Sequence, residues 1–360
     1  MPQTADPEPR KKPARIRLRL LATSDVHAAI LPYDYSAGKV SGCYGLARAA
    51  NLIARARKEV GGQCLLLDNG DFLQGSPLSD LHDATDPDTP HPVITTMNKL
   101  GYDAASLGNH EFNFGLDPLL KTLGQVEFPV ICANALTHRG ATVAEDETLL
   151  PPAVLIKRQV TDENGDPHEL KIGILGVLPP QITAWDKFHL GQEVSARDMV
   201  ETVAARVPML RAQGADLVVL LAHTGIDRGP RQAGMENAAL SLAQVPGIDA
   251  IIAGHSHEVF PCPGAVHPAQ GVDHASGTFH GVPAVMPGFR ASHVGVIDLQ
   301  LTPNGSGWQV DRHHARLVGQ TGYRGTRSTR SRNHLVCRAL PCRPADALGR
   351  TSWAQRSADP

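Results

Sequence analysis

Two histidines with one serine between them follow a short apolar run in the last third of the chain. The stretch reads IDAIIAGHSHEVFP and places its imidazoles at His255 and His257. An apolar run of this length, bounded by turn residues, is typical of a strand buried on both faces. If the extended conformation continues past Gly254, both imidazoles project together from the strand end. Imidazole is a common metal ligand, but the chain has 17 histidines, so this pair alone leaves open a metal site or two surface loop residues.

Four more apolar runs end in polar residues of the same chemical kinds. A single polar residue after a strand is ordinary turn chemistry, and Asp68 or Asn69 could be no more than that. Five such ends, all with oxygen or nitrogen donors and no thiolate, instead predict a metal centre at one edge of the sheets. The residues that follow these four runs are Asp25 and His27, then Asp68, Asn69 and Asp71, then Asn109 and His110, and finally His223.

The predicted donors are numerous enough to supply three or four ligands to each of two ions. Two divalent ions about 3.5–4 Å apart can clamp an in-line displacement at phosphorus. Such ions need a shared ligand to offset their mutual repulsion, and the carboxylate of Asp71 is our choice for it. A shell of histidine, aspartate and asparagine favours Mn²⁺, Zn²⁺, Fe or Co²⁺ over Mg²⁺, which prefers oxygen ligands and water.

The elements that must position these residues alternate between strands and helices, with hairpins in addition. This pattern predicts an α/β fold with mixed sheets, as a two-sheet sandwich flanked by helices. The helix over 195–214 is expected to have Ser195 as its N-cap and Gly214 as its C-cap. Strands are predicted at 16–22, 64–67, 104–107, 129–134 and 215–223, helices at 45–62, 92–101, 116–124 and 195–214, and hairpins at 153–177 and 293–319.

Composition indicates a packed protein with no strong charge bias. The chain has 360 residues, 42% of them hydrophobic, and a formal net charge of -2, which gives no sign of a nucleic-acid partner. No apolar run approaches the roughly 18–20 residues that cross a bilayer, and the N-terminus shows no export signal, so we expect no membrane partner and a cytoplasmic location. The six cysteines form no C-x-x-C motif, which indicates neither a disulfide framework nor a thiolate zinc site.

The two ends of the chain differ from its middle. Residues 1–14 are rich in proline and charge and are predicted to be a disordered lead-in. Residues 321–360 contain eight arginines, no lysine and two acidic residues, without a period of 2 or 3.6. We interpret this tail as unstructured or as an aberrant, frameshifted end. The catalytic domain is therefore expected over residues 15–320.

The five polar blocks have a recognisable order. D-x-H, G-D, G-N-H-E, a lone histidine and G-H-x-H follow one another across residues 16–260, and this order resembles the calcineurin-like metallophosphoesterases. The resemblance implies a four-layer α-β-β-α sandwich with two mixed sheets. DNGDFLQGSPLSD, GNHEFNFGLD, GHSHEVFP and SHVGVIDLQL look like the 2′,3′-cyclic-nucleotide 2′-phosphodiesterase/3′-nucleotidase branch, over roughly residues 16–320. The related 5′-nucleotidases typically have Asp in place of Asn113.

The resemblance assigns a role to each of these residues. His110 would be no ligand but would contact the phosphate, stabilising charge or protonating the leaving oxygen, and Asn113 would orient it. Glu111 is expected to bind nearby backbone, and Asn134 to lie near the site or in a turn. The implied ligands are Asp25, His27, Asp71 and His257 for the first ion and Asp71, Asn109, His223 and His255 for the second.

The implied activity is hydrolysis of 2′,3′-cyclic nucleotides to 3′-nucleotides and of 3′-nucleotides to nucleosides, by a monomer acting on small nucleotides. Family members usually continue into a second domain that stacks the nucleobase, and the sequence is expected to lack it, with weak base recognition as the result. The alternatives are a 5′-nucleotidase or general phosphodiesterase, and a truncated remnant that binds metal without useful activity. Family members are often periplasmic, which is the alternative location.

Overall fold

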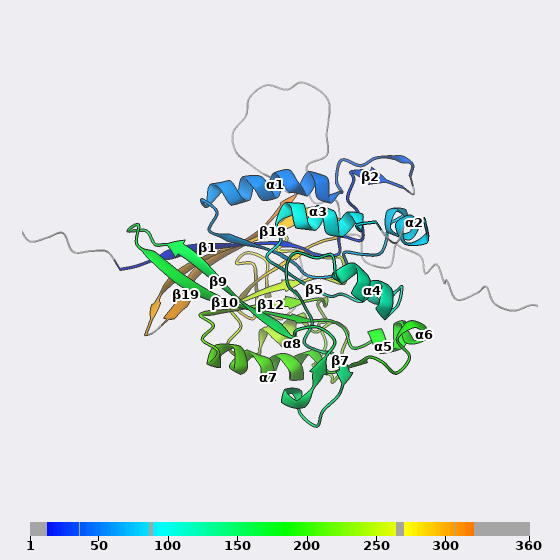
Figure 1. Ribbon diagram of the computed structural model, residues 1–360. Helices are drawn as coiled ribbons and strands as arrows, with labels where there is room; N and C mark the ends of the chain where they lie inside the picture. Colours follow the sequence, from blue (N-terminus) through cyan, green and yellow to red (C-terminus); the bar gives the residue numbers. More distant parts are fainter. Residues whose placement is uncertain (1–12, 36, 86–88, 264–269, 306, 320–360) are drawn as a thin grey trace, which may run out of the picture. The chain divides into compact units, whose positions relative to one another are not determined.

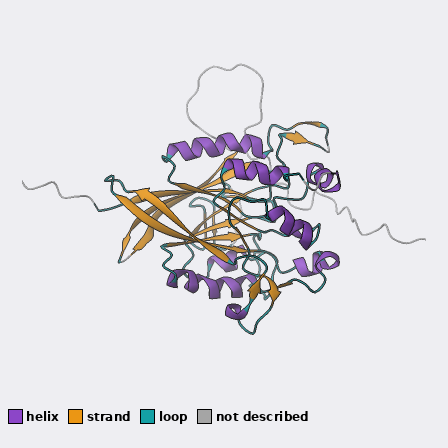
Figure 2. Cartoon of the chain, in the orientation of Figure 1, coloured by secondary structure: helices purple, strands orange, loops and turns teal. Residues whose placement is uncertain are grey.

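The computed structural model describes residues 13–35, 37–85, 89–263, 270–305 and 307–319 (Figure 1). The predicted tail at 321–360 lies outside the described residues, and so does the predicted lead-in apart from Pro13 and Ala14. Within the described ranges the chain forms two large sheets with helices against them (Figure 2).

The first sheet has six strands in the order β19-β18-β1-β4-β5-β6. Strands β1, β4, β5 and β6 run parallel, whereas β18 and β19 each pair antiparallel with their neighbours at the other side, so the sheet is mixed as predicted. The strands are β19 (Gly307–Gly319), β18 (His293–Asn304), β1 (Ile16–Thr23), β4 (Cys64–Asp68), β5 (Ala104–Ser106) and β6 (Val130–Ile131).

The second sheet runs in the order β15-β16-β17-β13-β12-β10-β9, with β14 paired to β17. Strands β10, β12, β13 and β17 are parallel, and β9, β14 and β16 are antiparallel to their neighbours. The strands are β15 (Val272–Asp273), β16 (Thr278–Phe279), β17 (Val282–Pro287), β13 (Ala250–Ala253), β12 (Leu217–Ala222), β10 (Pro167–Val177), β9 (Ala153–Thr161) and β14 (Val259–Phe260).

Three apolar cores follow from the alternation of side chains along these strands. In β1, Leu18 and Leu20 point into the core between the two sheets, whereas Leu21 packs against the helices. In β12, Val219 points into the shared core and Leu220 packs outward. Because successive side chains of a strand point to opposite faces, each buried strand contributes to two cores, which explains why these runs are continuously apolar.

Helices complete the outer layers. Helices α1 (Leu46–Glu59), α3 (Pro92–Leu100) and α4 (Leu116–Leu123) pack on the first sheet, and α7 (Met199–Ala212) and α8 (Ala239–Ala243) pack on the second. The predicted four-layer α-β-β-α sandwich with two mixed sheets is confirmed. The shorter elements are α2 (Pro77–Thr85), η1 (His110–Phe112), η2 (Val143–Glu145), α5 (Ile182–Trp185), α6 (Lys187–Leu190), β2 (Tyr33–Asp34), β3 (Lys39–Val40), β7 (Ala135–His138), β8 (Glu147–Thr148) and β11 (Ser195–Ala196).

One predicted helix start is wrong. Helix α7 begins at Met199, and its N-cap is Asp198, whose side chain accepts a hydrogen bond from the backbone N–H of Glu201. Ser195 instead lies in β11, paired with Leu136 of β7, so its backbone is already committed to a sheet. At the other end Gln213 is the C-cap, and Gly214 follows it with a φ of 90°.

No helix in the part of the chain that the structure describes has the length and apolar character needed to span a bilayer. The C-terminal ends of five parallel strands in the two sheets carry polar residues. The parallel strands β1, β4 and β5 of one sheet and β12 and β13 of the other each deliver a polar segment there.

Candidate metal centre

A first ligand group consists of Asp25, His27 and His257, whose donor atoms all lie within 4.8 Å of one another. Nε2 of His27 is 2.9 Å from Nε2 of His257, and Nε2 of His257 is 3.5 Å from Oδ1 of Asp25. Asp25 is fully buried, whereas the side chain of His257 is 40% exposed. The group therefore faces solvent on the His257 side.

A second ligand group consists of Asp71, His223 and His255, again with donor atoms within 4.8 Å of one another. Nε2 of His223 is 3.0 Å from Oδ2 of Asp71, and Nδ1 of His255 is 2.9 Å from Oδ1 of Asn109. The amide oxygen of Asn109 thus joins this group. His223 is fully buried and Asp71 is 1% exposed, so this group lies deeper than the first.

Asp71 lies between the two groups. Its carboxylate also falls within 4.8 Å of the ring nitrogens of His27 and His110. Oδ1 accepts a hydrogen bond from the backbone N–H of His110 at 2.7 Å, while Oδ2 faces His223. Asp71 is therefore near donors of both groups, His27 of the first and His223 of the second, which is the position that a bridging ligand would take.

The two histidines of the GHSH stretch do not share a strand side, so the expected extended geometry is wrong. Strand β13 ends at Ala253, and His255 and His257 adopt left-handed conformations with φ of 68° and 59°. A hydrogen bond from the N–H of Ser256 to the carbonyl of Gly254 turns the chain at once. As a result His255 reaches the second group and His257 the first.

Left-handed backbone is concentrated at this centre. Nine non-glycine residues among those described have positive φ, and five of them are candidate ligands: Asp25, His27, Asp71, His255 and His257. Such conformations cost about 1–3 kcal/mol each and cluster at functional sites. They give evidence for a site that does not depend on the residue types.

Glycines in the same motifs let the segments approach closely. A Cβ at Gly108 would overlap Oδ1 of Asp71 and the ring of His223, and one at Gly254 would overlap the side chains of Ser24 and Asp25. Both positions therefore require glycine for steric reasons, which accounts for the G-N-H-E and G-H-x-H patterns.

The free ring nitrogens fit a bound cation. Nδ1 of His27 donates to the carbonyl of Gln74 at 2.9 Å, and Nδ1 of His223 donates to the carbonyl of Asn69 at 2.7 Å. In each ring Nε2 is left to face the other candidate ligands, and Nε2 of His223 lies 3.0 Å from Oδ2 of Asp71. Carbonyl partners of this kind orient metal-ligating histidines.

The electrostatics of the second group also require positive charge. Burial lowers the pKa of His223, but the nearby carboxylates of Asp71 and Asp25 outweigh it and raise that pKa to about 10. Burial raises the pKa of Asp25 to about 7. In the first group, burial lowers the pKa of His27 to about 4 and that of His257 to about 3, so both rings are neutral and able to bind metal near pH 7.

His110 stands beside the ligands with a different environment. It begins η1, and its Nδ1 lies 2.6 Å from Oδ1 of Asn113. The ring meets that of His27 edge to face with centroids 5.0 Å apart. Asn113 therefore occupies the orienting place expected from the sequence.

Glu111 holds the backbone of the centre, as expected. Its buried carboxylate accepts hydrogen bonds from the N–H groups of Asp71, Phe72, Leu73 and Gly108 at 2.6–3.0 Å. Asn134 has a structural role in a turn. Its amide bonds backbone groups of Leu178 and Arg197 and accepts from the thiol of Cys132 at 3.8 Å.

Sequence reasoning missed two carboxylates at the site. Oε1 of Glu236 lies 2.7 Å from Nε2 of His255, and Oδ1 of Asp186 accepts from the amide of Asn113 at 2.8 Å. Both come from segments without apolar periodicity and without a metal-ligand spacing. Asp186 follows Trp185, whose ring stacks on that of His255 with centroids 5.7 Å apart, and no signal in the sequence would have identified it.

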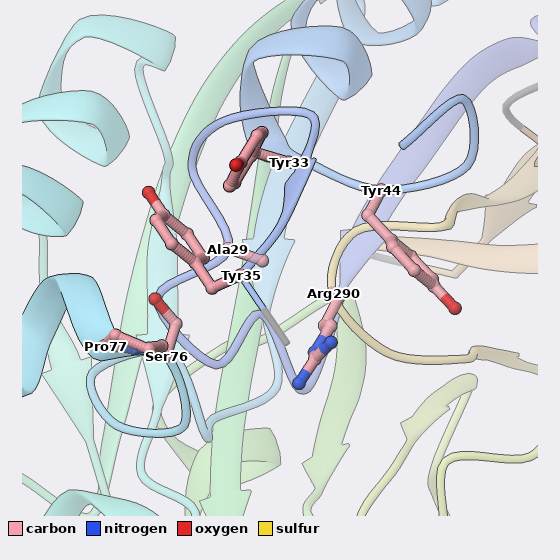
Figure 3. Close-up of a pocket in the computed structure, with 7 residues that line it drawn as sticks. All are labelled: Ala29, Tyr33, Tyr35, Tyr44, Ser76, Pro77 and Arg290. Carbon is pink, nitrogen blue, oxygen red and sulfur yellow. The ribbon is translucent and has the colours of Figure 1, made fainter. Parts of the chain in front are cut away.

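A small aromatic pocket of about 20 Å³ is lined in part by Arg290, which is bonded through its backbone to Asp25 of the first ligand group. The ring of Phe289 stacks on His257 with centroids 4.8 Å apart, and the next residue, Arg290, donates its backbone N–H to the carbonyl of Asp25. The guanidinium carbon of Arg290 lies 5.9 Å from the ring centroid of Tyr44. Figure 3 shows the residues that line the pocket: Ala29, Tyr33, Tyr35, Tyr44, Ser76, Pro77 and Arg290.

Comparison with known proteins agrees with this geometry. Residues 18–259 match the family model described as calcineurin-like phosphoesterase. This range covers more than half of the chain and contains all the candidate ligands. The chain belongs to the calcineurin-like phosphoesterase family, which confirms the resemblance found in the sequence.

Particular relatives refine the picture. A 2′,3′-cyclic-nucleotide 2′-phosphodiesterase/3′-nucleotidase of Salmonella typhimurium is 42% identical over 305 residues, which are 84% of this chain and 46% of that protein. The crystal structure of calcineurin-like phosphoesterase YfkN from Bacillus subtilis matches with a TM-score of 0.79 and 39% identity, covering 85% of this chain and 91% of that one. A snake venom 5′-nucleotidase of Gloydius brevicauda is more distant, at 31% over 67% of this chain and 37% of its own. The chain spans less than half the length of these curated relatives.

Proposed function

We propose that this protein is a metal-dependent phosphoesterase that hydrolyses 2′,3′-cyclic nucleotides to 3′-nucleotides and 3′-nucleotides to nucleosides. The observation that carries the proposal is the presence of two ligand groups at the ends of parallel strands, with Asp71 in the second group and also within 4.8 Å of the ring nitrogens of His27 and His110. The names of the relatives at 40–42% identity support this choice of substrate over 5′-nucleotides.

Two divalent ions would occupy the centre. Asp25, His27 and His257 would hold the first, Asn109, His223 and His255 the second, and Asp71 both. The mixed imidazole and oxygen donors suit Mn²⁺, Zn²⁺, Fe or Co²⁺. When bound, such a pair supplies Lewis acidity and a water of lowered pKa to a reaction at phosphorus.

His110 would act on the substrate rather than on the ions. With Nδ1 engaged by Asn113, Nε2 is the nitrogen available to the phosphate or to the leaving oxygen. Proton donation from Nε2 as the P–O bond breaks would leave the leaving group as a neutral alcohol. This role is worth about 10²–10⁴-fold in rate for typical acid–base groups.

The pocket near the first ligand group is too small for a base, at about 20 Å³, but the tyrosines and the cation around it offer a surface for the nucleoside part of such a substrate. It combines three tyrosines with one cation, and aromatic faces stack bases with about 1–3 kcal/mol per base in nucleic-acid sites. The substrate would therefore extend from the metals past His257 rather than toward the buried His223.

The experiment that tests the proposal starts from protein stripped with chelator and refilled with Mn²⁺ or Co²⁺. Initial rates on bis(p-nitrophenyl) phosphate, 2′,3′-cyclic AMP, 3′-AMP and 5′-AMP are compared at equal concentration. We expect metal-dependent cleavage, faster on 2′,3′-cyclic AMP than on 5′-AMP. No activity with two ions bound would indicate a silent metal-binding protein, and a preference for 5′-AMP would indicate a 5′-nucleotidase.

A further inference from the structure

A chain of hydrogen bonds leads away from His110 through Asn113 to a buried carboxylate. Nδ1 of His110 is 2.6 Å from Oδ1 of Asn113, and Nδ2 of Asn113 donates to Oδ1 of Asp186 at 2.8 Å. Asp186 lies 73 residues further along the chain, at the junction between α5 and α6. Two side chains, Asn113 and Asp186, are thus lined up behind the ring of His110.

The carboxylate fixes the direction of every bond in this chain. An ionised carboxylate only accepts hydrogen bonds, so Asn113 must turn its NH₂ group toward Asp186. The amide oxygen then faces His110, and that oxygen can only accept. Nδ1 of His110 must therefore carry a proton, which leaves Nε2 as the nitrogen that exchanges protons with the substrate.

Asp186 has few other tasks in the fold. It precedes α6, but its side chain makes no capping hydrogen bond there. It is 7% exposed, and among the described residues the amide of Asn113 is the one side-chain donor it bonds. Burial raises the pKa of its carboxyl group, while the hydrogen bond from Asn113 and the charge of His110 act in the opposite direction. Burying a carboxylate beside a neutral donor costs stability. A functional role for Asp186 would explain why the protein keeps it there.

We propose that Asp186 is a positioning residue that sets the tautomer and orientation of His110 through Asn113. Asp186 carries the negative charge that the amide of Asn113 lacks, and it lies behind Asn113 as seen from His110. For the reaction the ring must carry a proton on each nitrogen. The proton on Nε2 passes to the leaving oxygen as the P–O bond breaks, and the proton on Nδ1 stays in its bond to Asn113, so the ring is left as the neutral Nδ1–H tautomer. This inference rests on the proposed phosphoesterase function.

The test exchanges the two groups. Asp186→Asn removes the fixed acceptor and lets the amide of Asn113 turn, so that His110 loses its fixed partner. Asn113→Asp keeps an acceptor at Nδ1 of His110 but places two carboxylates in contact, so they repel and disturb the position of the ring. The double variant Asn113→Asp/Asp186→Asn rebuilds the chain in another form, with a carboxylate on His110 and an amide donating to it. We expect each single variant to lose about 10- to 100-fold in kcat on 2′,3′-cyclic AMP, the usual effect of groups that orient a site residue. The double variant should recover about tenfold over either single one, because groups in one network are strongly coupled.

Bis(p-nitrophenyl) phosphate provides the internal control, because p-nitrophenolate leaves without a proton. Asp186→Asn should lose much less kcat on this substrate. The loss of kcat in His110→Ala sets the upper limit for any effect that Asp186 can have through His110. Equal losses on both substrates, or a double variant no better than the single ones, would overturn the inference and assign Asp186 to folding alone. Wild-type protein without activity on either substrate would instead refute the proposed function.

Discussion

The two ligand groups differ in how they are held. The first group, Asp25, His27 and His257, opens to solvent at His257, which is backed by an aromatic ring. The second is buried around His223, with a carboxylate behind its outer histidine, His255. Burial lowers the pKa of His27 and His257 in the first group and of His255 in the second, whereas the pKa of His223, beside Asp71 and Asp25, is raised.

This difference indicates that the two groups would bind their ions with different strength. In the first group the imidazoles of His27 and His257 are neutral and bind an ion without first losing a proton, and Asp25 supplies the negative charge. This group opens to solvent at His257, which gives a bound ion a way out. Buried carboxylates around His223 attract positive charge strongly, so an ion there replaces a proton and is held by charge. We therefore expect the second ion to be retained more firmly and the first to face the substrate.

The largest expected effect comes from removing the group that joins both sides. Asp71→Asn takes away one negative charge and leaves an amide that cannot bridge with two equivalent oxygens. We expect occupancy to fall at both sites and activity to disappear, whereas His27→Ala should mainly empty the first. Metal counting by mass spectrometry of the two variants distinguishes these patterns. Two full sites in Asp71→Asn would remove the bridging assignment.

A smaller, one-sided effect is expected from Glu236. Its carboxylate at Nε2 of His255 fixes that ring and increases its basicity, and loss of such a partner costs about 10–100-fold in metal affinity. Glu236→Gln should therefore weaken the second site and spare the first. Glu258→Gln, an exposed change in the neighbouring loop, is the matched control and should alter neither. Stepwise removal of metal by chelator, with the ions counted at each step, measures both sites. A loss shared equally between them would contradict the separation of the two groups.

How far the sequence could predict this site is clear from particular residues. The apolar runs and the polar residues after them predicted the strands, the four layers and the set of side chains that meets at their ends. The runs could not show that His255 and His257 diverge, because that depends on left-handed turns after Gly254.

The supporting residues were beyond prediction for a related reason. Glu236 and Asp186 act through contacts with residues far away in the chain, and neither stands in a periodic segment. The start of α7 was misplaced because Ser195, a good capping residue, is used for strand pairing. Long-range pairing of this kind overrides local preference, and a single sequence carries no direct record of it.

The smallest expected effect concerns the open side of the first group. Arg290 lies against the rings of Phe289 and Tyr44, 5.8 and 5.9 Å from their centroids, and makes no carboxylate ion pair within the described ranges. If the substrate extends past His257, this cation attracts its negative charge. An exposed or partly exposed contact of this kind is worth about 0.5–1 kcal/mol. Arg290→Ala should therefore raise KM for 2′,3′-cyclic AMP about two- to fivefold, with kcat nearly unchanged.

The control for Arg290 removes one positive charge from a helix that does not line the pocket. Arg55→Ala, exposed on α1, changes the net charge equally without touching the pocket. A KM that rises only in Arg290→Ala, and rises less at high salt because charges at the surface are screened, places the substrate on the open side. Equal KM values in the two variants would mean that the protein attracts its substrate through net charge alone, and the second group would then have to be reconsidered as the side that the substrate approaches.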